Sequence, residues 1–362
     1  MSNINLDAAS KALTAYSSVG CVRSIVAHGN GHINGTFKID AEKGTYILQR
    51  INDYVFKDPR GLMDNILKIG EHLRKKAALS GGDLKRCTLN VVFTDSGEPL
   101  VQTDDGYWRM YEFVNDSISY DTVTSVDDFK KSARAFGEFQ RLLVDFPAHT
   151  LCEPIKDFHN TPVRYDNFVK ALEANRSGRA HLAENEIEFV KQREKFASAL
   201  EEAHASGRLP LRVTHNDTKL NNILFDVKTG DALCIIDLDT VSPGYSVTDF
   251  GDAIRFGANT AAEDEKDLSL VSLDLDLFGA YAEGFIEGCG GRLEPEEIKL
   301  LPVGAMMMTF ECGMRFLTDY LDGDVYFRTE YPDHNLVRCR NQFALLADME
   351  RKKAQMDSHL GL

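Results

Sequence analysis

Residues 21–114 consist of short apolar runs separated by turn residues. Glycine, asparagine and aspartate lie between the runs, which is the usual pattern of strands joined by turns. One helix interrupts them, because Leu62, Ile66, Ile69 and Leu73 recur at the spacing of one helical face. We also expect a first helix over residues 7–16. The expected strands are residues 22–27, 36–40, 45–50, 88–93 and 107–114, which together predict a small β-rich lobe.

The pattern becomes helical from Ser125 onward. Ser125 and Asp128 have the spacing of a capping box, and Phe129, Ala133 and Phe136 then follow along one helical face. The exceptions in this half are a short strand at residues 211–213 and a hairpin after it. We therefore predict an α+β, two-lobed, protein-kinase-like fold, with an N-terminal lobe at residues 1–114, a hinge near 111–119 and a helical lobe at 115–362.

The hairpin follows a polar segment that contains Asp217 and Asn222. Apolar residues 223–225 and 232–236 are separated by a polar stretch with Gly230, which predicts a tight turn between two strands. Asp237 comes directly after the second strand. A hairpin returns to the end where it began, so Asn222 and Asp237 are expected at the same edge.

These three residues match the layout of a kinase catalytic loop and its metal-binding aspartate. Asp217 would accept the proton of an attacking hydroxyl and aim its oxygen at the γ-phosphorus of ATP. Asn222 and Asp237 would hold Mg²⁺, a hard cation that takes oxygen ligands and borrows several from phosphates. The alternative is a turn with local side-chain hydrogen bonds, which is common in loops. His215 is expected to pack and orient the loop.

Composition narrows the class of protein. The chain has 362 residues and a formal net charge of -15, which argues against nucleic acid or an anionic membrane as the main partner. Its 7 cysteines are scattered and predict neither a disulfide framework nor a zinc site. Residues 1–7 lack the features of a signal peptide, so we expect a soluble, cytoplasmic protein. We also expect a monomer or weak homo-oligomer.

A glycine-bearing loop is the first candidate contact for nucleotide phosphates. Gly29, Gly31 and Gly35 lie between two predicted strands, where backbone N–H groups could approach phosphates. Their spacing is not that of a P-loop, and an ordinary hairpin is the alternative. The segment Tyr111, Glu112 and Phe113 is expected to be the hinge whose backbone faces the adenine.

The third predicted strand departs from protein kinases, which place a lysine there to hold phosphates. Gln49 occupies the expected position and Arg50 follows it. Because neighbouring side chains of a strand point to opposite faces, only one of the two can reach the phosphates, and the sequence does not choose between them. Asp64 and Glu71 are equally open as the helix partner.

Three motifs together resemble the aminoglycoside phosphotransferase and choline kinase superfamily. They are residues 215–222, 236–240 and 243–252. Within it the chain is similar to the N-acetylhexosamine 1-kinases, through residues 31–34, 46–49, 255–258, 311–316 and 331–338. This resemblance implies ATP- and Mg²⁺-dependent phosphorylation of the anomeric hydroxyl of N-acetylglucosamine or N-acetylgalactosamine. It also implies that Gln49 belongs to an active enzyme.

A sugar site requires hydrogen-bonding side chains and an apolar contact for the ring. Asp217 and Asp239 are expected near the reacting carbon, with a second metal ligand or loop scaffold as the alternative role of Asp239. His32 and Arg315 resemble sugar-binding positions of the family; otherwise His32 would be an exposed loop residue and Arg315 a structural ion pair. Phe256 and Tyr326 could line the sugar, although aromatic residues in a helical lobe usually belong to the core.

Two other classes of function remain open. One is a small-molecule kinase of the same superfamily with an aminoglycoside, choline or homoserine acceptor, for which an acidic acceptor pocket is expected. The other is a pseudokinase that binds nucleotide as an interaction module, indicated only by the missing lysine. Basic residues around the acceptor would argue against the first, and release of ADP would exclude the second.

Overall fold

The chain folds into two compact units. The computed structural model describes residues 6–29, 34–120, 122–123 and 125–362. The first unit contains residues 1–118, 149–156 and 224–242, and the second contains residues 119–148, 157–223 and 243–362. Two segments that the sequence places in the C-terminal lobe, 149–156 and 224–242, thus fold with the β-rich unit.

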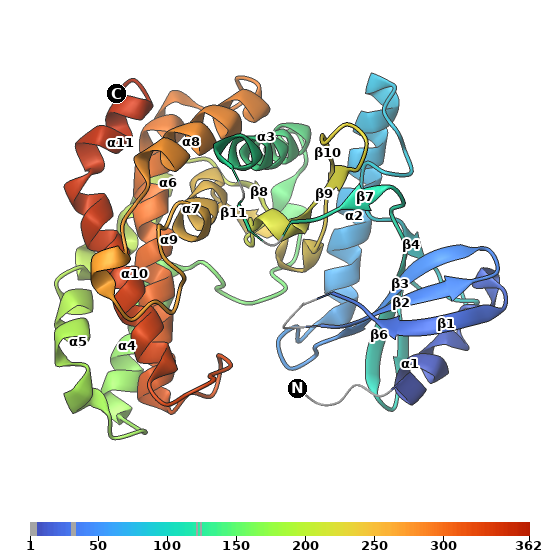
Figure 1. Cartoon of the computed structure of the whole chain (residues 1–362), viewed down its shortest axis with the longest axis horizontal. Coiled ribbons are helices and arrows are strands. Elements are labelled where there is room, and N and C mark those ends of the chain that lie inside the picture. Colours follow the sequence, from blue (N-terminus) through green and yellow to red (C-terminus); the bar gives the residue numbers. More distant parts are fainter. Residues whose placement is uncertain (1–5, 30–33, 121, 124) are drawn as a thin grey trace. The chain divides into compact units, whose positions relative to one another are not determined.

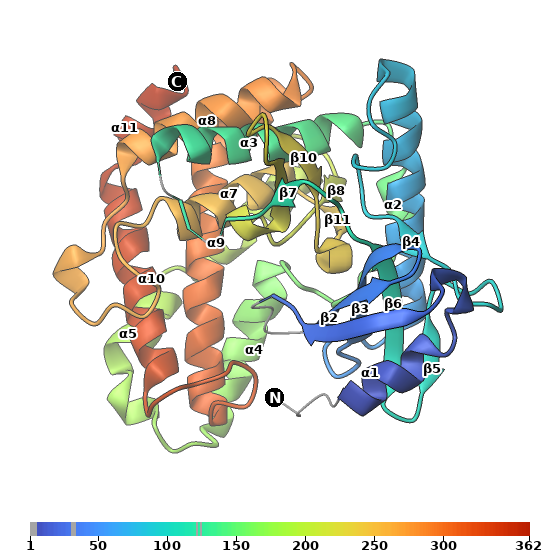
Figure 2. The ribbon, with the colours of Figure 1, turned by 45° about the vertical axis from the view of Figure 1, so that its right-hand side comes forward.

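An antiparallel sheet forms the centre of the first unit (Figures 1 and 2). Its strand order is β1-β2-β3-β6-β4, and β5 also pairs with β6. Most of the strands expected from the sequence are confirmed, but β4 is shorter than expected and β5 was not anticipated. The strands are β1 (Val22–Ala27), β2 (Gly35–Ala41), β3 (Gly44–Ile51), β4 (Val91–Val92), β5 (Val101–Thr103) and β6 (Gly106–Glu112).

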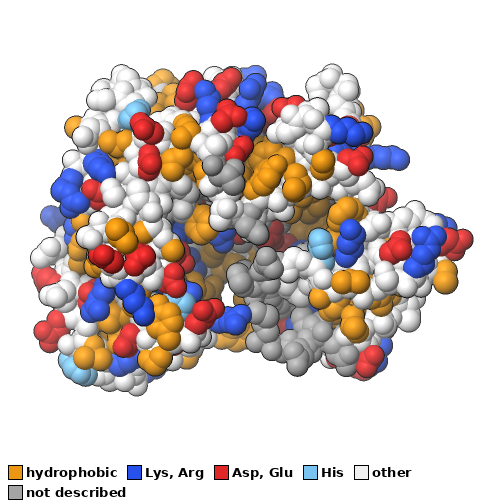
Figure 3. All heavy atoms as spheres, viewed as in Figure 1, with side chains coloured by type: hydrophobic (Ala, Val, Ile, Leu, Met, Phe, Trp, Pro, Cys, Tyr) orange, Lys and Arg blue, Asp and Glu red, His pale blue; other side chains and the backbone are white. Residues whose placement is uncertain are grey.

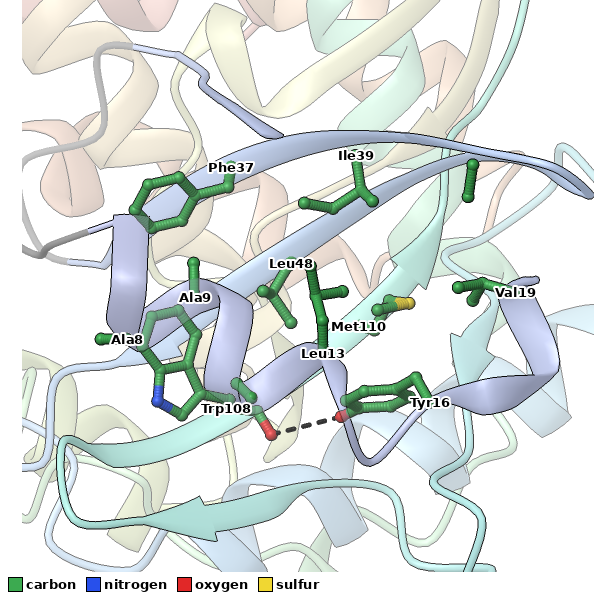
Figure 4. Packing of buried hydrophobic residues seen from close by; sticks show 12 residues of the cluster. Ala8, Ala9, Leu13, Tyr16, Val19, Phe37, Ile39, Leu48, Trp108 and Met110 are labelled. Atoms are coloured by element: carbon green, nitrogen blue, oxygen red, sulfur yellow. Dashed lines mark hydrogen bonds between the residues drawn. The ribbon is translucent and has the colours of Figure 1, made fainter. Parts of the chain in front are cut away.

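The core of this unit lies between the sheet and helix α1 (Leu6–Leu13), as Figure 4 shows. Trp108 is fully buried, and its ring lies 6.1 Å from that of Phe37. The hydroxyl of Tyr16 donates to the backbone oxygen of Trp108 at 3.4 Å. Burial of such large side chains supplies most of the stability of a small sheet.

The predicted hairpin is confirmed and belongs to the first unit. Strands β9 (Ile223–Asp226) and β10 (Ala232–Ile235) pair, and Gly230 has φ 72°, the left-handed conformation that a tight turn requires. Strand β7 (Ser117–Ile118) pairs with β9. In addition, the side chain of Asn65, in helix α2 (Pro59–Ser80), donates to the backbone oxygen of Val241 at 3.1 Å. These contacts explain why residues 224–242 fold with the sheet.

The second unit is helical. Helix α3 packs along α8, and the long helix α9 contacts α4, α7 and α10 (Figures 1 and 2). Ser125 caps α3 as expected, accepting from the backbone N–H of Asp128 at 3.1 Å. The helices are α3 (Val126–Leu142), α4 (Thr161–Ala174), α5 (Glu184–Lys191), α6 (Ala199–Ala205), α7 (Ser246–Gly257), α8 (Leu275–Cys289), α9 (Pro295–Asp322), α10 (His334–Arg351) and α11 (Lys353–His359).

Helix α9 forms the core of this unit. It has 28 residues, and by length and composition it could cross a membrane, but 78% of its most apolar window is buried. Helix α7 approaches it closely where Gly251 faces Gly304, because a Cβ on either residue would clash with backbone of the other helix. Strand β8 (Arg212–Thr214) pairs with β11 (Ser242–Gly244) and leads into the segment that contains Asp217.

Candidate active site

The backbone of the loop around Asp217 is held by a buried carboxylate. Asp249, in α7, accepts from the backbone N–H groups of His215 at 2.9 Å and Asn216 at 2.8 Å. Gln140 donates to the same carboxylate at 2.7 Å. Asn216 has φ 64°, a left-handed conformation that asparagine tolerates. The loop is therefore fixed in a left-handed conformation immediately before Asp217. Asp249 thus supports the segment before Asp217.

Asp217 itself is oriented by two side chains of its own loop. Lys219 Nζ lies 2.8 Å from Oδ1 of Asp217, and Asn222 Nδ2 donates to Oδ2 at 3.1 Å. The carboxylate remains 26% exposed. Burial by itself lowers the pKa of Lys219, but the charges of Asp217 and Asp252 outweigh it and raise that pKa above its ordinary value. Asp217 thus has a fixed direction and an accessible face.

The amide oxygen of Asn222 is a ligand atom of the kind that a hard cation takes. Its amide nitrogen donates to Asp217, to Oδ2 and to the backbone oxygen at 2.9 Å. Neither bond uses the amide oxygen. Asn222 directly precedes β9, and Asp237 follows β10 with φ 57°. The hairpin therefore returns both residues to its same end, as the sequence predicted.

A buried ion pair lies at the centre of the first unit. Arg109, in β6, and Asp239, two residues after Asp237, form two contacts, Nη1–Oδ1 at 2.6 Å and Nη2–Oδ2 at 2.8 Å. Their side chains are only 1% and 3% exposed. Burial alone would lower the pKa of Arg109, but the charge of Asp239 raises it overall. The side chain of Asn34 also donates to Oδ2 at 2.6 Å.

The contacts of Arg109 show which face of the sheet Gln49 and Arg50 each lie on. Gln49 pairs with Arg109 in the β3–β6 register and accepts from its Nε at 3.1 Å and its Nη2 at 2.9 Å. Arg50 points to the other face, where its Nε donates to the backbone oxygen of Asp105. Gln49, and not Arg50, therefore lies on the side of the sheet that meets Asp239.

A cavity in the second unit contains two of the predicted acceptor residues. Arg315 and Tyr326 line a space of about 370 Å³ between α4, α9 and residues 325–327. The guanidinium of Arg315 lies 5.8 Å from the ring of Tyr326 and 5.5 Å from that of Phe327. Phe256 is 44% exposed and is not among the described residues that line this cavity. The remaining lining residues are Arg164, Asn167, Lys170, Ala171, Arg176, Thr318, Asp319, Asp322 and Val325.

Hydrogen bonds connect this cavity to the catalytic loop. His159 Nε2 lies 3.3 Å from the backbone oxygen of Asn216, and its Nδ1 lies 2.8 Å from Glu311 Oε1. Glu311 is buried, and burial alone would raise its pKa, but the charge of His159 lowers it overall. Arg315 follows Glu311 by about one helical turn. The cavity therefore begins close to the loop that holds Asp217.

Comparison with known proteins identifies the family of the chain. The model of the phosphotransferase enzyme family, abbreviated APH, matches residues 24–281. The chain belongs to this phosphotransferase family. An aminoglycoside phosphotransferase from Alicyclobacillus acidocaldarius superposes with a TM-score of 0.63 at 13% identity, covering 97% of this chain and 96% of the other. The phosphotransferase thus has the protein-kinase-like α+β fold, with a β-sheet N-terminal region and a helical C-terminal region.

Two further solved structures share this fold. A choline/ethanolamine kinase family protein from Mesorhizobium loti has a TM-score of 0.56 at 17% identity, with 98% and 97% of the two chains covered. A spectinomycin phosphotransferase, solved with ADP and spectinomycin, has a TM-score of 0.56 at 11% identity, with 98% and 99% covered. The likeness to these structures is one of fold, and the match to the family model identifies the chain as a phosphotransferase.

The predicted nucleotide contacts of the phosphotransferase lie in the first unit. Gly29 follows β1 with φ 75°, whereas Gly31 and His32 lie outside the described residues. Tyr111 is buried in β6. The backbone N–H groups of Glu112 and Phe113 donate to the backbone oxygens of Asn90 and Thr45, at 2.9 and 3.0 Å. A hinge contact to adenine would therefore use other groups of residues 111–119.

Sequence reasoning missed several residues of this site. Arg109 interrupts an apolar strand with a charge, which is a signal of a buried ion pair, but its partner is 130 residues away. His159 and Glu311 are isolated in the sequence and meet only in the fold. No group of three or more His, Cys, Asp or Glu side chains suited to a metal occurs in the described part of the chain.

Proposed function

We propose that this phosphotransferase transfers the γ-phosphoryl group of ATP to the anomeric hydroxyl of an N-acetylhexosamine, with Mg²⁺ as cofactor. N-acetylglucosamine and N-acetylgalactosamine are the two proposed acceptors, and the product is N-acetylhexosamine 1-phosphate. The observation that carries the proposal is the basic cavity beside the catalytic loop. The resemblance of residues 255–258, 311–316 and 331–338 to N-acetylhexosamine 1-kinases supports the same acceptor.

The charge of the cavity favours a neutral acceptor over a cationic one. Arg164 and Arg315 both line it, and an ammonium group beside two guanidinium groups is repelled. A sugar instead offers hydroxyl and acetamide oxygens to these donors. The rings of Tyr326 and Phe327 offer the apolar contact for a sugar ring.

Asp217 is the residue proposed to act on the acceptor. Its exposed carboxylate accepts the proton of the anomeric hydroxyl and directs that oxygen at the γ-phosphorus. Lys219 fixes the direction of the carboxylate. Asp249 holds the backbone of the loop, so the geometry of Asp217 is set before substrate binds.

The oxygen donors of Asn222 and Asp237 fit Mg²⁺. One amide oxygen and one carboxylate are a suitable set for a cation that completes its octahedron with water and phosphate oxygens. When bound, Mg²⁺ neutralises the charge that develops on the phosphates. The Arg109–Asp239 pair restrains the segment that carries Asp237, and we assign Asp239 this scaffold role because Arg109 and Asn34 engage its carboxylate.

The phosphate and adenine contacts are proposed on the first unit. Gly29 and Gly31 offer backbone groups to the phosphates, and Gln49 lies on the face that meets Asp239. His32, outside the described residues, and Phe256 remain proposed acceptor contacts.

A panel of acceptors tests the function. The enzyme is incubated with Mg²⁺, ATP and N-acetylglucosamine, N-acetylgalactosamine, glucose, choline or an aminoglycoside, and both ADP and the reducing end of the sugar are measured. Equal loss of reducing end and gain of ADP with the N-acetylhexosamines is expected. ADP release with an intact reducing end would place the phosphate on another hydroxyl. The Asp217→Ala variant is the control for ATP hydrolysis by contaminants, and ADP release that depends on Asp217 excludes a pseudokinase.

A second candidate is a kinase for a cationic amino alcohol. The aromatic rings around Arg315 favour it, because such rings also bind quaternary ammonium groups. The choline arm of the same panel decides between the two acceptors.

A further inference from the structure

The cavity of the second unit contains more positive charge than a neutral sugar requires. Four basic side chains line it: Arg164, Lys170, Arg176 and Arg315. The whole chain has 56 acidic and 41 Lys and Arg residues, and basic and acidic side chains are mixed over the face shown in Figure 3. A group of four cations around one cavity is therefore unusual for this protein.

The two carboxylates of the cavity do not neutralise this group. Asp319 accepts from the backbone N–H groups of residues 325–327 at 2.8 to 3.0 Å and from the side chain of Asn335 at 2.8 Å. It therefore serves to hold the segment that carries Tyr326. Asp322 lies 3.3 Å from Arg176 and pairs with it alone among the cations of the cavity.

Three cations consequently have no carboxylate of the described residues within 4.0 Å: Arg164, Lys170 and Arg315. Arg164 donates from Nε and Nη2 to the backbone oxygen of Phe158, at 3.1 and 2.9 Å. Arg315 contacts aromatic rings, including that of Phe158 at 5.2 Å. Burial, and then the charge of Arg315, lower the pKa of Arg164. The two guanidinium groups repel each other across the cavity, and an anion between them would relieve this repulsion.

The cavity also extends away from the catalytic loop. Arg164 and Arg315 lie near the loop, since His159 and Glu311 connect α9 to the backbone of Asn216. Lys170 lies six residues further along α4, which is about 9 Å at 1.5 Å per residue. Along α4, Lys170 thus lies farther from the catalytic loop than Arg164 does.

We propose that this cavity contains a subsite for an oxyanion, a sulfate, phosphate or carboxylate group, held by Arg164, Lys170 and Arg315. If the proposed sugar 1-kinase activity holds, the oxyanion is a substituent of the acceptor remote from its anomeric carbon. A free inorganic anion that occupies the same cations is the other source of this chemistry. Guanidinium and ammonium donors form strong hydrogen bonds with such groups.

The binding test does not depend on turnover. The melting temperature of the full-length protein is measured against sodium sulfate and against sodium chloride at matched ionic strength. We expect a saturable increase specific to sulfate, reduced in Lys170→Met and retained in Lys191→Met. Lys191 is an exposed lysine of α5 in the same unit, so the control removes the same charge away from the cavity. Equal responses of the two variants, or no response specific to sulfate, would overturn the subsite.

The kinetic test separates the two sources of the anion. The values of kcat/KM for N-acetylglucosamine and its 6-sulfate are compared in the wild type and both variants. Loss of one charge-assisted contact in Lys170→Met should lower kcat/KM for the sulfated sugar about 10-fold and leave the unmodified sugar unchanged. Free sulfate should then compete with the sulfated acceptor. Sulfate binding without preference for the sulfated sugar supports a free-anion subsite and rejects the acceptor-borne one.

These outcomes also distinguish the subsite from the proposed function. Sulfate binding that depends on Lys170, without phosphorylation of any N-acetylhexosamine, would reject the sugar kinase and keep the subsite. Normal turnover of N-acetylglucosamine with no effect of sulfate or of Lys170→Met would reject the subsite and keep the sugar kinase.

Discussion

At the residue scale, this phosphotransferase uses polar side chains whose partners fix their direction. Asp217 is oriented by Lys219 and Asn222, and the backbone before it by Asp249. Arg109 and Asp239 form a buried pair in the other unit. In each case a specific partner in the fold fixes the direction of the polar side chain. The consequences of removing one partner therefore differ between the exposed site and the buried pair.

Asp217→Ala should reduce kcat by about two to four orders of magnitude, the usual contribution of a positioned general base. ATP affinity should change little, because the variant keeps Asn222, Asp237 and the first unit. Turnover and nucleotide affinity are measured separately, and the melting temperature controls for misfolding. Turnover close to that of the wild type would remove Asp217 from the mechanism.

Replacement of either member of the buried pair should destabilise the protein. Arg109→Met leaves the carboxylate of Asp239 buried without its counter-ion, and we expect a loss of about 3–5 kcal/mol in the free energy of unfolding. The double variant Arg109→Met, Asp239→Asn should lose less than the sum of the single variants. Urea denaturation of all four proteins measures the coupling, and additive losses would contradict a direct interaction.

At the element scale, the catalytic loop depends on how α7 packs. Helix α7 carries Asp249 and Asp252, which accept from the backbone N–H groups of residues 215, 216 and 218. The same helix contacts α9 where Gly251 faces Gly304. The spacing of two helices therefore determines the position of a loop that neither of them contains.

Gly251→Ala should test this dependence. The added Cβ would lie closer than 3.0 Å to the backbone of Gly304, so α7 must shift, with an expected cost of about 1–3 kcal/mol and a lower kcat. Gly70→Ala is the matched control in α2, where the nearest atom belongs to the flexible side chain of Arg74. Urea denaturation and steady-state kinetics check both variants. Equal effects of the two substitutions on stability and kcat would show that the α7–α9 contact does not control the catalytic loop.

At the scale of the whole molecule, the proposed Mg²⁺ should act on the stability of the folded chain. Ligand binding to the folded state should stabilise the protein as a whole, by about 2.7 kcal/mol at 100 times the dissociation constant. The metal should therefore influence the stability of the full chain.

Asp237→Ala should remove the Mg²⁺-dependent part of the stabilisation by ATP. The melting temperature is measured with ATP, with and without Mg²⁺, for the wild type and the variant. The wild type should gain stability on addition of Mg²⁺, and the variant should not. An unchanged Mg²⁺ effect in the variant would exclude Asp237 as a ligand.

Glu201, in α6, should make stability depend on pH. Burial raises its pKa to about 7, from the ordinary glutamate value of 4.5. Between these values the folded protein binds the proton and the unfolded chain does not, so this residue lowers stability as the pH rises through that window. Glu201→Gln should reduce this decline. Denaturation midpoints at several pH values measure it, and an identical pH profile would contradict the shift.

Local pattern in the sequence was sufficient for much of this protein. Strand alternation, the cap at Ser125 and the turn at Gly230 are short-range features, and the structure confirms the elements that they predict. The order Asp217, Asn222, hairpin and Asp237 is also local, because only a few residues separate its parts. The fold class follows from the succession of these elements.

Tertiary structure alone decided the long-range partners. Arg109 meets Asp239 across 130 positions, and His159 meets Glu311 across 152. The placement of Gln49 rather than Arg50 on the face of the sheet that meets Asp239 depends on strand register and on Arg109 beside it. The basic cavity requires α4 and α9 to pack together. Spacing along the chain carries no information about such contacts, since they form only when burial brings distant elements into register.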